Sequence, residues 1–170
     1  MGLIKQLPES VSNQISAGEV IERPASIVKE LVENSIDAGS TQILVEIENG
    51  GRDKVRIKDN GSGISDDDIE LAFARYATSK IDNVNDLYSI KTLGFRGEAL
   101  ASIASISKIE ITSRTRKSMK GTYMKLNGGE IIKKEPIGTQ IGTDIVIEDI
   151  FYNTPARFKY LKTSNTEFGH

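Results

Sequence analysis

Residues 29–39, KELVENSIDAG, combine an aliphatic stripe with side chains that can do chemistry. A carboxylate such as that of Glu30 can act as a general base, and an amide oxygen such as that of Asn34 can bind a divalent cation. With Asp37, these side chains form a polar group on a predicted helix. The alternative interpretation is that Glu30 and Asp37 are ordinary solvated charges on a helix surface.

The angular positions of the side chains predict where this polar group lies. Each helical residue turns the chain by about 100°, and four aliphatic residues then fall in one core-facing sector: Ile27, Val28, Leu31 and Val32. Ile36 is also expected to contribute to the aliphatic stripe. The polar group falls about 280° to 340° from Ile27, directly beside the sector. We therefore expect it at the edge of the core, partly desolvated and rigidly held.

The segment DNGSGI, residues 59–64, follows a predicted strand. Asp59 can accept a hydrogen bond from an exocyclic amine, and Gly61 and Gly63 allow the backbone to bend closely around a flat ligand. An ordinary Asx turn is the alternative, because Asp-Asn-Gly favours such a turn.

The segment TLGFRGEAL, residues 92–100, is a glycine-rich loop that leads into a predicted helix. Free amides at a helix N-terminus bind phosphate, and Gly94 and Gly97 allow a close approach. The loop matches neither the Walker pattern nor G-x-G-x-x-G. Alternatively, it is a surface turn in which Glu98 stabilises the first helical turn. Taken together, the acidic helix, the Asp-Gly turn and this loop predict a nucleotide site.

The elements that position these groups alternate between helical and strand patterns. Helices are predicted at 8–18, 24–38, 66–75, 98–106 and 154–162. Strands are predicted at 41–49, 54–60, 108–115, 121–128, 130–135 and 143–149. Glycine pairs at 50–51 and 128–129 predict hairpins, and Ser65 with Asp68 resembles a capping box. We predict an α/β two-layer sandwich with a mixed, mostly antiparallel sheet and helices on one face.

Composition excludes several kinds of chemistry. The 170 residues contain no cysteine and one histidine, the final His170, so thiolate metal sites, disulfides and Ser-His catalysis are not expected. No apolar run approaches the roughly 20 residues of a membrane helix, and the N-terminus lacks the pattern of a secretory signal. We expect a cytoplasmic domain without membrane contact. The net charge of -2 provides no general attraction to nucleic acid.

Five segments closely resemble the MutL family of DNA mismatch repair proteins, which shares an ATPase superfamily with type II topoisomerase subunits, a heat-shock chaperone and sensor histidine kinases. They are ENSIDAG at 33–39, DNGSGI at 59–64, ATSK at 77–80, TLGFRGEAL at 92–100 and FYNTPAR at 151–157. GFRGEAL and the segment from Asn13 to Gly39 are the most specific to MutL. The resemblance runs from Leu7 to Phe168 and implies a Bergerat-type ATPase fold.

The resemblance implies a role for each matching residue, with ATP and Mg²⁺ as cofactors. Glu30 would be the general base that activates the attacking water, and Asn34 would bind Mg²⁺. Asp59 would read the adenine amino group, with help from Thr143 through water, and would select ATP over GTP. Gly63 would pack against the base.

Further positions are implied by the same resemblance. Asp37 and Ala38 would form the floor of the nucleotide site, with Gly61 and Ile64 beside them. Residues of the lid would be Thr78, Ser79 and Lys80. Residues that hold the phosphates would be Leu93, Gly94, Phe95, Arg96, Gly97, Glu98, Ala99 and Leu100. Many relatives have His where this chain has Tyr76, for which we expect a small effect.

The resemblance also implies that residues 1–170 are one ATP-binding domain of a longer protein. The second N-terminal subdomain, which supplies a lysine to the γ-phosphate, and the C-terminal dimerisation domain would be missing. We therefore expect weak or absent ATP hydrolysis, because one transition-state charge is lost. The parent protein is expected to be a homodimer and the fragment a monomer. Its partners would be the mismatch-recognition protein MutS, downstream repair enzymes and DNA.

Two other interpretations remain open from the residues alone. The chain could be a DNA- or protein-binding module with a vestigial nucleotide pocket, in which basic stretches at 114–121 and 156–162 touch phosphates. It could also belong to the topoisomerase branch of the superfamily. GFRGEAL followed by FYNTPAR disfavours that branch.

Overall fold

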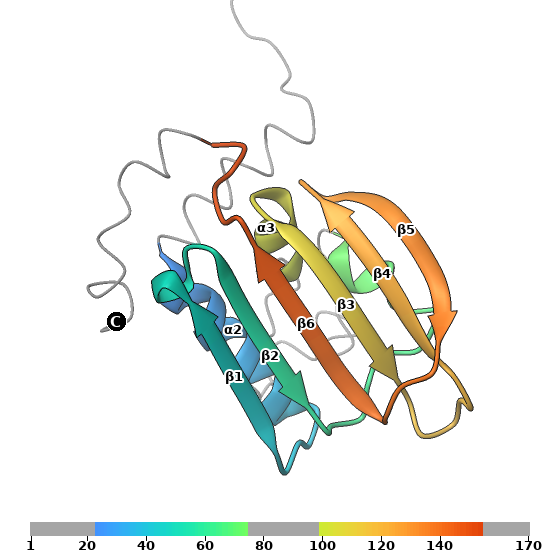
Figure 1. The fold of residues 1–170 in the computed structure, drawn as a ribbon. Coiled ribbons are helices and arrows are strands. Elements are labelled where there is room, and N and C mark those ends of the chain that lie inside the picture. The colour runs from blue at the N-terminus through green and yellow to red at the C-terminus, as the bar shows by residue number, and fades with distance from the viewer. Residues whose placement is uncertain (1–22, 75–98, 155–170) are drawn as a thin grey trace, which may run out of the picture.

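The computed structural model describes residues 23–74 and 99–154 (Figure 1). Its helices are α2 (Pro24–Asp37) and α3 (Ala99–Ser105), with short 3-10 helices η1 (Asn49–Gly51) and η2 (Leu71–Phe73). Its strands are β1 (Ile43–Glu48), β2 (Lys54–Asp59), β3 (Lys108–Arg114), β4 (Gly121–Asn127), β5 (Glu130–Ile137) and β6 (Gly142–Glu148). All six predicted strands are therefore confirmed, with boundaries that differ by a few residues at most.

The strands form one sheet in the order β1-β2-β6-β3-β4-β5. All five pairings among the described strands are antiparallel. The last strand in sequence, β6, lies between β2 and β3 and joins the β1-β2 hairpin to the β3-β4-β5 meander. In Figure 1, α2, α3 and η2 all lie behind the sheet, and its front face is open. The predicted two-layer sandwich with a mostly antiparallel sheet is confirmed.

The core lies between the sheet and the helices. Alternate residues of the central strands face the helices, and two rows of them are aliphatic and almost fully buried. One row joins Ile57, Ile145 and Ile111. The next joins Val55, Ile147 and Ile109. Burial of these side chains removes apolar surface from water and fixes the register of the sheet.

Helix α2 packs its predicted aliphatic sector on β2. Ile27 is 0% and Leu31 3% exposed, and Val28 and Val32 pack against the same core. The expected contribution of Ile36 is wrong, because this side chain is 55% exposed. Nine residues after Ile27, it lies about 180° around the helix and outside the sector.

The predicted helix at 66–75 is wrong. Residues 66–70 form a turn, and only Leu71–Phe73 are helical, as the 3-10 helix η2. The amides of Asp68 and Ile69 both donate to the backbone carbonyl of Ser65. These are main-chain bonds of a turn and differ from the side-chain bonds of the predicted capping box. Buried Ile69 anchors the turn, while Asp66 and Glu70 contact Lys134 of β5. These tertiary contacts override the helical periodicity.

Other local predictions have mixed outcomes. Gly39, with φ +75°, follows the end of α2 as predicted, and Gly128 and Gly129 form the β4-β5 turn with φ +58° and +89°. The helix expected at 98–106 is present as the shorter α3. The helix at 8–18, and all but the first residue of that at 154–162, lie outside the described residues. In the part of the chain that is described, no helix is long and apolar enough to cross a membrane.

The open face of the sheet carries charged side chains. The guanidinium of Arg56 donates to both carboxylate oxygens of Asp144 at 3.0 and 2.7 Å and to Glu46 at 3.3 Å. The hydrogen bond to Asp144 is the main cause that raises the pKa of Arg56 above its ordinary value. Nearby, the Tyr123 hydroxyl donates to Glu110 at 2.8 Å. Burial, followed by this hydrogen bond, raises the pKa of Tyr123 to about 12.

Candidate functional site

A row of polar side chains crosses the helix-facing side of the sheet, directly beyond the aliphatic rows. Asp59 of β2 pairs with Thr143 of β6, Thr143 with Ser113 of β3, and Ser113 with Thr122 of β4. Ser113 is 1% and Thr122 4% exposed. Buried polar groups require hydrogen-bond partners, and the partners here decide what the row can bind. We call these four residues the polar row.

The Asp59 carboxylate is held by three donors. Its Oδ2 accepts from the Ser35 hydroxyl at 2.7 Å, and its Oδ1 accepts from the amides of Gly61 at 2.9 Å and Thr143 at 3.3 Å. An ionised carboxylate has about four acceptor positions. These donors use three positions, so within the described part of the chain one position on Oδ2 can still accept a hydrogen bond from a ligand.

The polar group of α2 lies beside Asp59. The bond from Ser35, which is 3% exposed, fixes the helix against the end of β2. Glu30, Asn34 and Asp37 are half-buried, as predicted for the edge of the core, and are not fully solvated charges. Glu30 and Asn34 are one helical turn apart, which corresponds to a rise of about 6 Å.

The DNGSG turn packs on the C-terminal end of α2. The Ser62 amide donates to the Ala38 carbonyl at 3.0 Å, and a Cβ at Gly61 would lie 2.8 Å from the Ala38 Cβ. The bond from the Gly61 amide to Asp59 is the Asx turn that was the alternative interpretation. The Asx turn and the ligand-binding role of Asp59 are compatible, because the turn uses Oδ1 and one acceptor position of Oδ2 remains for a ligand.

Two other glycines allow close contacts between backbone segments of the protein. Gly63 has φ +75°, and a Cβ there would lie 2.0 Å from the Arg114 carbonyl oxygen. Gly142 has φ +126°, and a Cβ there would lie 2.1 Å from the Asp59 carbonyl oxygen. The close approach at Gly63 therefore has a cause within the protein, without any flat ligand.

Within the polar row, Ser113 connects three segments of the chain. Its hydroxyl oxygen accepts from the Ile64 amide at 2.8 Å, donates to the Gly142 carbonyl at 3.0 Å and lies 2.7 Å from the Thr143 hydroxyl. Because Ser113 has one proton, donation to Gly142 leaves Thr143 as the donor in the third contact. Thr143 then presents only acceptor lone pairs toward the site.

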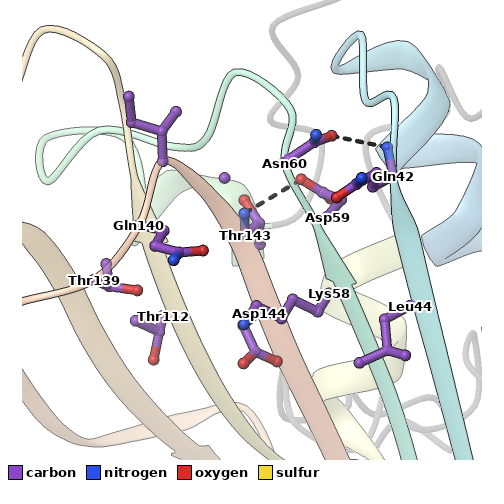
Figure 2. Close-up of a pocket in the computed structure, with 12 residues that line it drawn as sticks. Gln42, Leu44, Lys58, Asp59, Asn60, Thr112, Thr139, Gln140, Thr143 and Asp144 are labelled. Carbon is purple, nitrogen blue, oxygen red and sulfur yellow. Dashed lines mark hydrogen bonds between the residues drawn. The ribbon is translucent and has the colours of Figure 1, made fainter.

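A small cavity of about 210 Å³ lies on the opposite side of the same strands (Figure 2). Leu44, Lys58, Thr112 and Asp144 line it and alternate with the helix-facing residues of their strands. Asp59 and Thr143 also line this cavity. Their hydrogen bonds to Ser35 and Ser113 lie on the helix-facing side of the sheet, where the candidate site is.

Eleven of the predicted site residues are described, and the structure brings five of them into one connected group. Asp59, Gly61, Thr143 and Ala38 form one connected group, and Ile64 joins it through Ser113. Ala99 begins α3, and Leu100 packs against the common core. Nine predicted residues lie outside the described part of the chain: Thr78, Ser79, Lys80, Leu93, Gly94, Phe95, Arg96, Gly97 and Glu98.

Sequence reasoning missed Ser35, Ser113 and Thr122. A signal for Ser35 was present, because it falls about 80° from Ile27, within the aliphatic sector of α2. Ser113 and Thr122 continue the alternation of buried residues in their strands, after Ile109 and Ile111 and before Met124. A polar residue in an otherwise apolar series indicates a satisfied, buried hydrogen-bonding group.

The fold agrees with a comparison of the sequence with known families. The family described as Histidine kinase-, DNA gyrase B-, and HSP90-like ATPase matches residues 22–149. This match includes every described element of the sheet and both helices of the second layer. The chain belongs to this family of ATPases.

Within that family, the chain is similar to MutL proteins. It is 68% identical to the DNA mismatch repair protein MutL of Halothermothrix orenii over 167 residues, which cover 98% of this chain and 26% of that protein. It is 59% identical to MutL of Shouchella clausii over 170 residues, which cover 100% of this chain and 26% of that protein. The resemblance seen in the sequence is confirmed, and the chain spans about a quarter of the length of these relatives.

Solved structures agree with this assignment. The Aquifex aeolicus MutL ATPase domain complexed with ADP matches with a TM-score of 0.66 and 36% identity, covering 87% of this chain and 51% of that one. The N-terminal domain of a DNA repair protein matches with a TM-score of 0.78 and 34% identity, covering 96% and 48%.

Proposed function

We propose that this chain binds ATP with Mg²⁺ between α2 and the polar row, as the nucleotide-binding part of a MutL-type mismatch repair protein. The observation that carries this proposal is the Asp59 carboxylate, which is fixed by three donors and has one acceptor position left. That position suits an N–H donor such as the adenine amino group. Thr143, as an acceptor, suits a water that bridges to the same base.

Asn34 is the residue proposed to hold Mg²⁺. Its amide oxygen is a hard donor, which suits this ion, and Mg²⁺ bound with nucleotides takes few protein ligands and keeps phosphate oxygens and waters. The described residues contain no group of three His, Cys, Asp or Glu side chains that could hold a metal alone. When bound, Mg²⁺ would neutralise phosphate charge.

Glu30 is proposed as the general base. It is half-buried one turn from Asn34 on the same face of α2, so a rigid element holds it close to the proposed metal ligand. Its carboxylate would accept a proton from the attacking water and orient that water. The nine predicted residues outside the described part would contribute the lid and the phosphate-binding loop.

The remaining parts of the proposal concern the longer protein. The nucleotide would act as a conformational switch, with MutS, downstream repair enzymes and DNA as partners and a homodimer as the assembly. Hydrolysis by these 170 residues would be weak, and the location of the protein would be cytoplasmic. Arg114 is a poor candidate for DNA contact, because its guanidinium donates to the carbonyls of Ser118 and Thr139.

Calorimetric titration of the chain with ATP and Mg²⁺ tests the proposed site. Asp59→Ala should weaken ATP binding by about tenfold or more, because a hydrogen bond to a charged group is lost. Asn34→Ala should remove the increase in ATP affinity that Mg²⁺ causes. Asp67→Ala, which removes an exposed carboxylate in the turn at 66–70, is the matched control and should bind normally.

Equal ATP affinity in all four proteins would contradict the proposed roles. A wild-type chain that gives no heat with Mg²⁺-ATP but binds DNA in a salt-dependent manner would favour the vestigial-pocket alternative instead.

A further inference from the structure

We propose that Ser35 is a positioning residue for base selection, whose hydroxyl orients the Asp59 carboxylate so that the site accepts an amino-purine and rejects a carbonyl. This inference rests on the proposed function and assigns a role to a residue that would not touch the nucleotide.

The geometry around Asp59 gives Ser35 a separate task from the backbone donors. Both amide donors, from Gly61 and Thr143, bind Oδ1. The terminal torsion of an aspartate is broad, and rotation about it moves both carboxylate oxygens together. Donors on both oxygens therefore hold the carboxylate more firmly than the two amides on Oδ1 would alone. The Ser35 hydroxyl, at 2.7 Å from Oδ2, is the described donor that fixes this second oxygen.

The hydroxyl of Ser35 donates to another segment of the protein and not to the backbone of its own helix. A serine inside a helix commonly bonds to the carbonyl one turn earlier. Here the proton is donated across the layers to β2, and the residue is 3% exposed, so water does not compete for it. Bonds to a charged acceptor are the strong ones. Ser35 therefore fixes the position of α2, which carries Asn34, relative to β2, which carries Asp59.

This arrangement affects base selection because only one acceptor position remains on Oδ2. An amino group can donate to it, whereas a carbonyl oxygen at the same place would meet a negative oxygen at close range. If the carboxylate swings, the acceptor leaves this position, and the preference for the amino-purine falls. GTP gains no hydrogen bond from this acceptor, so GTP affinity should not fall when the carboxylate swings.

The test measures the affinities for Mg²⁺-ATP and Mg²⁺-GTP in Ser35→Ala, Asp59→Ala and the double variant. Ser35→Ala should weaken ATP binding about tenfold and reduce the ATP-to-GTP affinity ratio by the same factor. In the Asp59→Ala background, Ser35→Ala should have no further effect on ATP affinity, because the residue acts through the carboxylate.

A matched control separates positioning from loss of a buried hydroxyl. Ser107 is 0% exposed and donates to the Ile103 carbonyl, at the opposite end of β3 from Ser113. Ser107→Ala should leave the affinity ratio unchanged. Thermal melting without nucleotide checks folding, and Ser35→Ala should fold because alanine favours helix more than serine does.

The outcomes distinguish this inference from the proposed function. If Asp59→Ala leaves ATP affinity unchanged, or if the wild-type chain binds no ATP, the proposed function fails and the inference fails with it. If Asp59→Ala weakens ATP binding but Ser35→Ala leaves the affinity ratio within twofold of wild type, only the inference is overturned. An equal loss of ATP and GTP affinity in Ser35→Ala also overturns it, since that result indicates a structural role.

Discussion

The two faces of the sheet handle polar side chains in opposite ways, and adjacent residues of β6 show the difference. Thr143 belongs to the polar row beneath the helices, where its partners are the neutral hydroxyl of Ser113 and the fixed carboxylate of Asp59. The next residue, Asp144, faces the open side and pairs with Arg56 at 2.7 Å. On the covered face, hydrogen bonds within the protein fix the polar row, whereas the open face pairs full charges near water.

This difference predicts unequal energies for contacts of similar length. A buried hydrogen-bonding group that loses its partner cannot recover it from solvent, so the loss costs its desolvation energy. A charge on the open face remains partly hydrated, and salt screens its partner. Stability should therefore depend on the polar row much more than on the ion pairs.

Ser113→Ala should have the largest effect on stability. It leaves the Ile64 amide and the Thr143 hydroxyl without a buried partner, which should lower the free energy of unfolding by about 2 kcal/mol. Urea unfolding measures this change. Thr112→Val is the matched control on the open face of the same strand and should remain within about 0.5 kcal/mol of wild type. Equal losses of stability in Ser113→Ala and Thr112→Val would show that the covered face does not depend on its hydrogen bonds more than the open face does.

Arg56→Met should have a smaller effect, although it removes three hydrogen bonds to carboxylates. The side chain is 28% exposed, and pairs of this kind contribute less than about 1 kcal/mol. Urea unfolding at low and high salt measures it, and the difference from wild type should shrink as salt rises. A decrease in the free energy of unfolding as large as that of Ser113→Ala would show that the charge pairs of the open face contribute as much as buried hydrogen bonds.

Tyr123 should give the smallest effect, and only in alkali. Its pKa is raised from 10.0 to about 12, so the folded state keeps the phenol proton that the unfolded state releases. This contribution to stability is complete below pH 10 and is lost as pH rises through 12. Ultraviolet titration should detect one tyrosine that ionises late, and Tyr123→Phe should remove it. Uniform ionisation of all tyrosines would contradict the role of Glu110.

Much of the fold could be predicted because local patterns agree with the final packing. Alternating aliphatic residues and glycine pairs define the strands, and the wheel of α2 places Ile27 and Leu31 correctly. The helix at 66–75 failed because tertiary contacts of this segment, chiefly the burial of Ile69 in the core, decide its conformation. The position of β6 between β2 and β3 also depends on long-range pairing, which local sequence does not contain.

The site could be predicted in part for the same reason. Glu30, Asn34 and Asp59 have reactive side chains at recognisable spacings, so sequence reasoning and the MutL resemblance both select them. Ser35 and Ser113 act through other residues, and their roles appear only when α2, β3 and β6 are brought together. Their spacing predicts that both hydroxyls are buried, but it does not identify the residue that each hydroxyl contacts.

The three glycines at 61, 63 and 142 also constrain how this sequence can change during evolution. At each position a single added methyl group would overlap an atom of another segment of the chain. Substitution by alanine should therefore be selected against at these three positions, even though none of them supplies a functional side chain. Lineages that keep this pocket should retain all three glycines and should accumulate their variation on the open face.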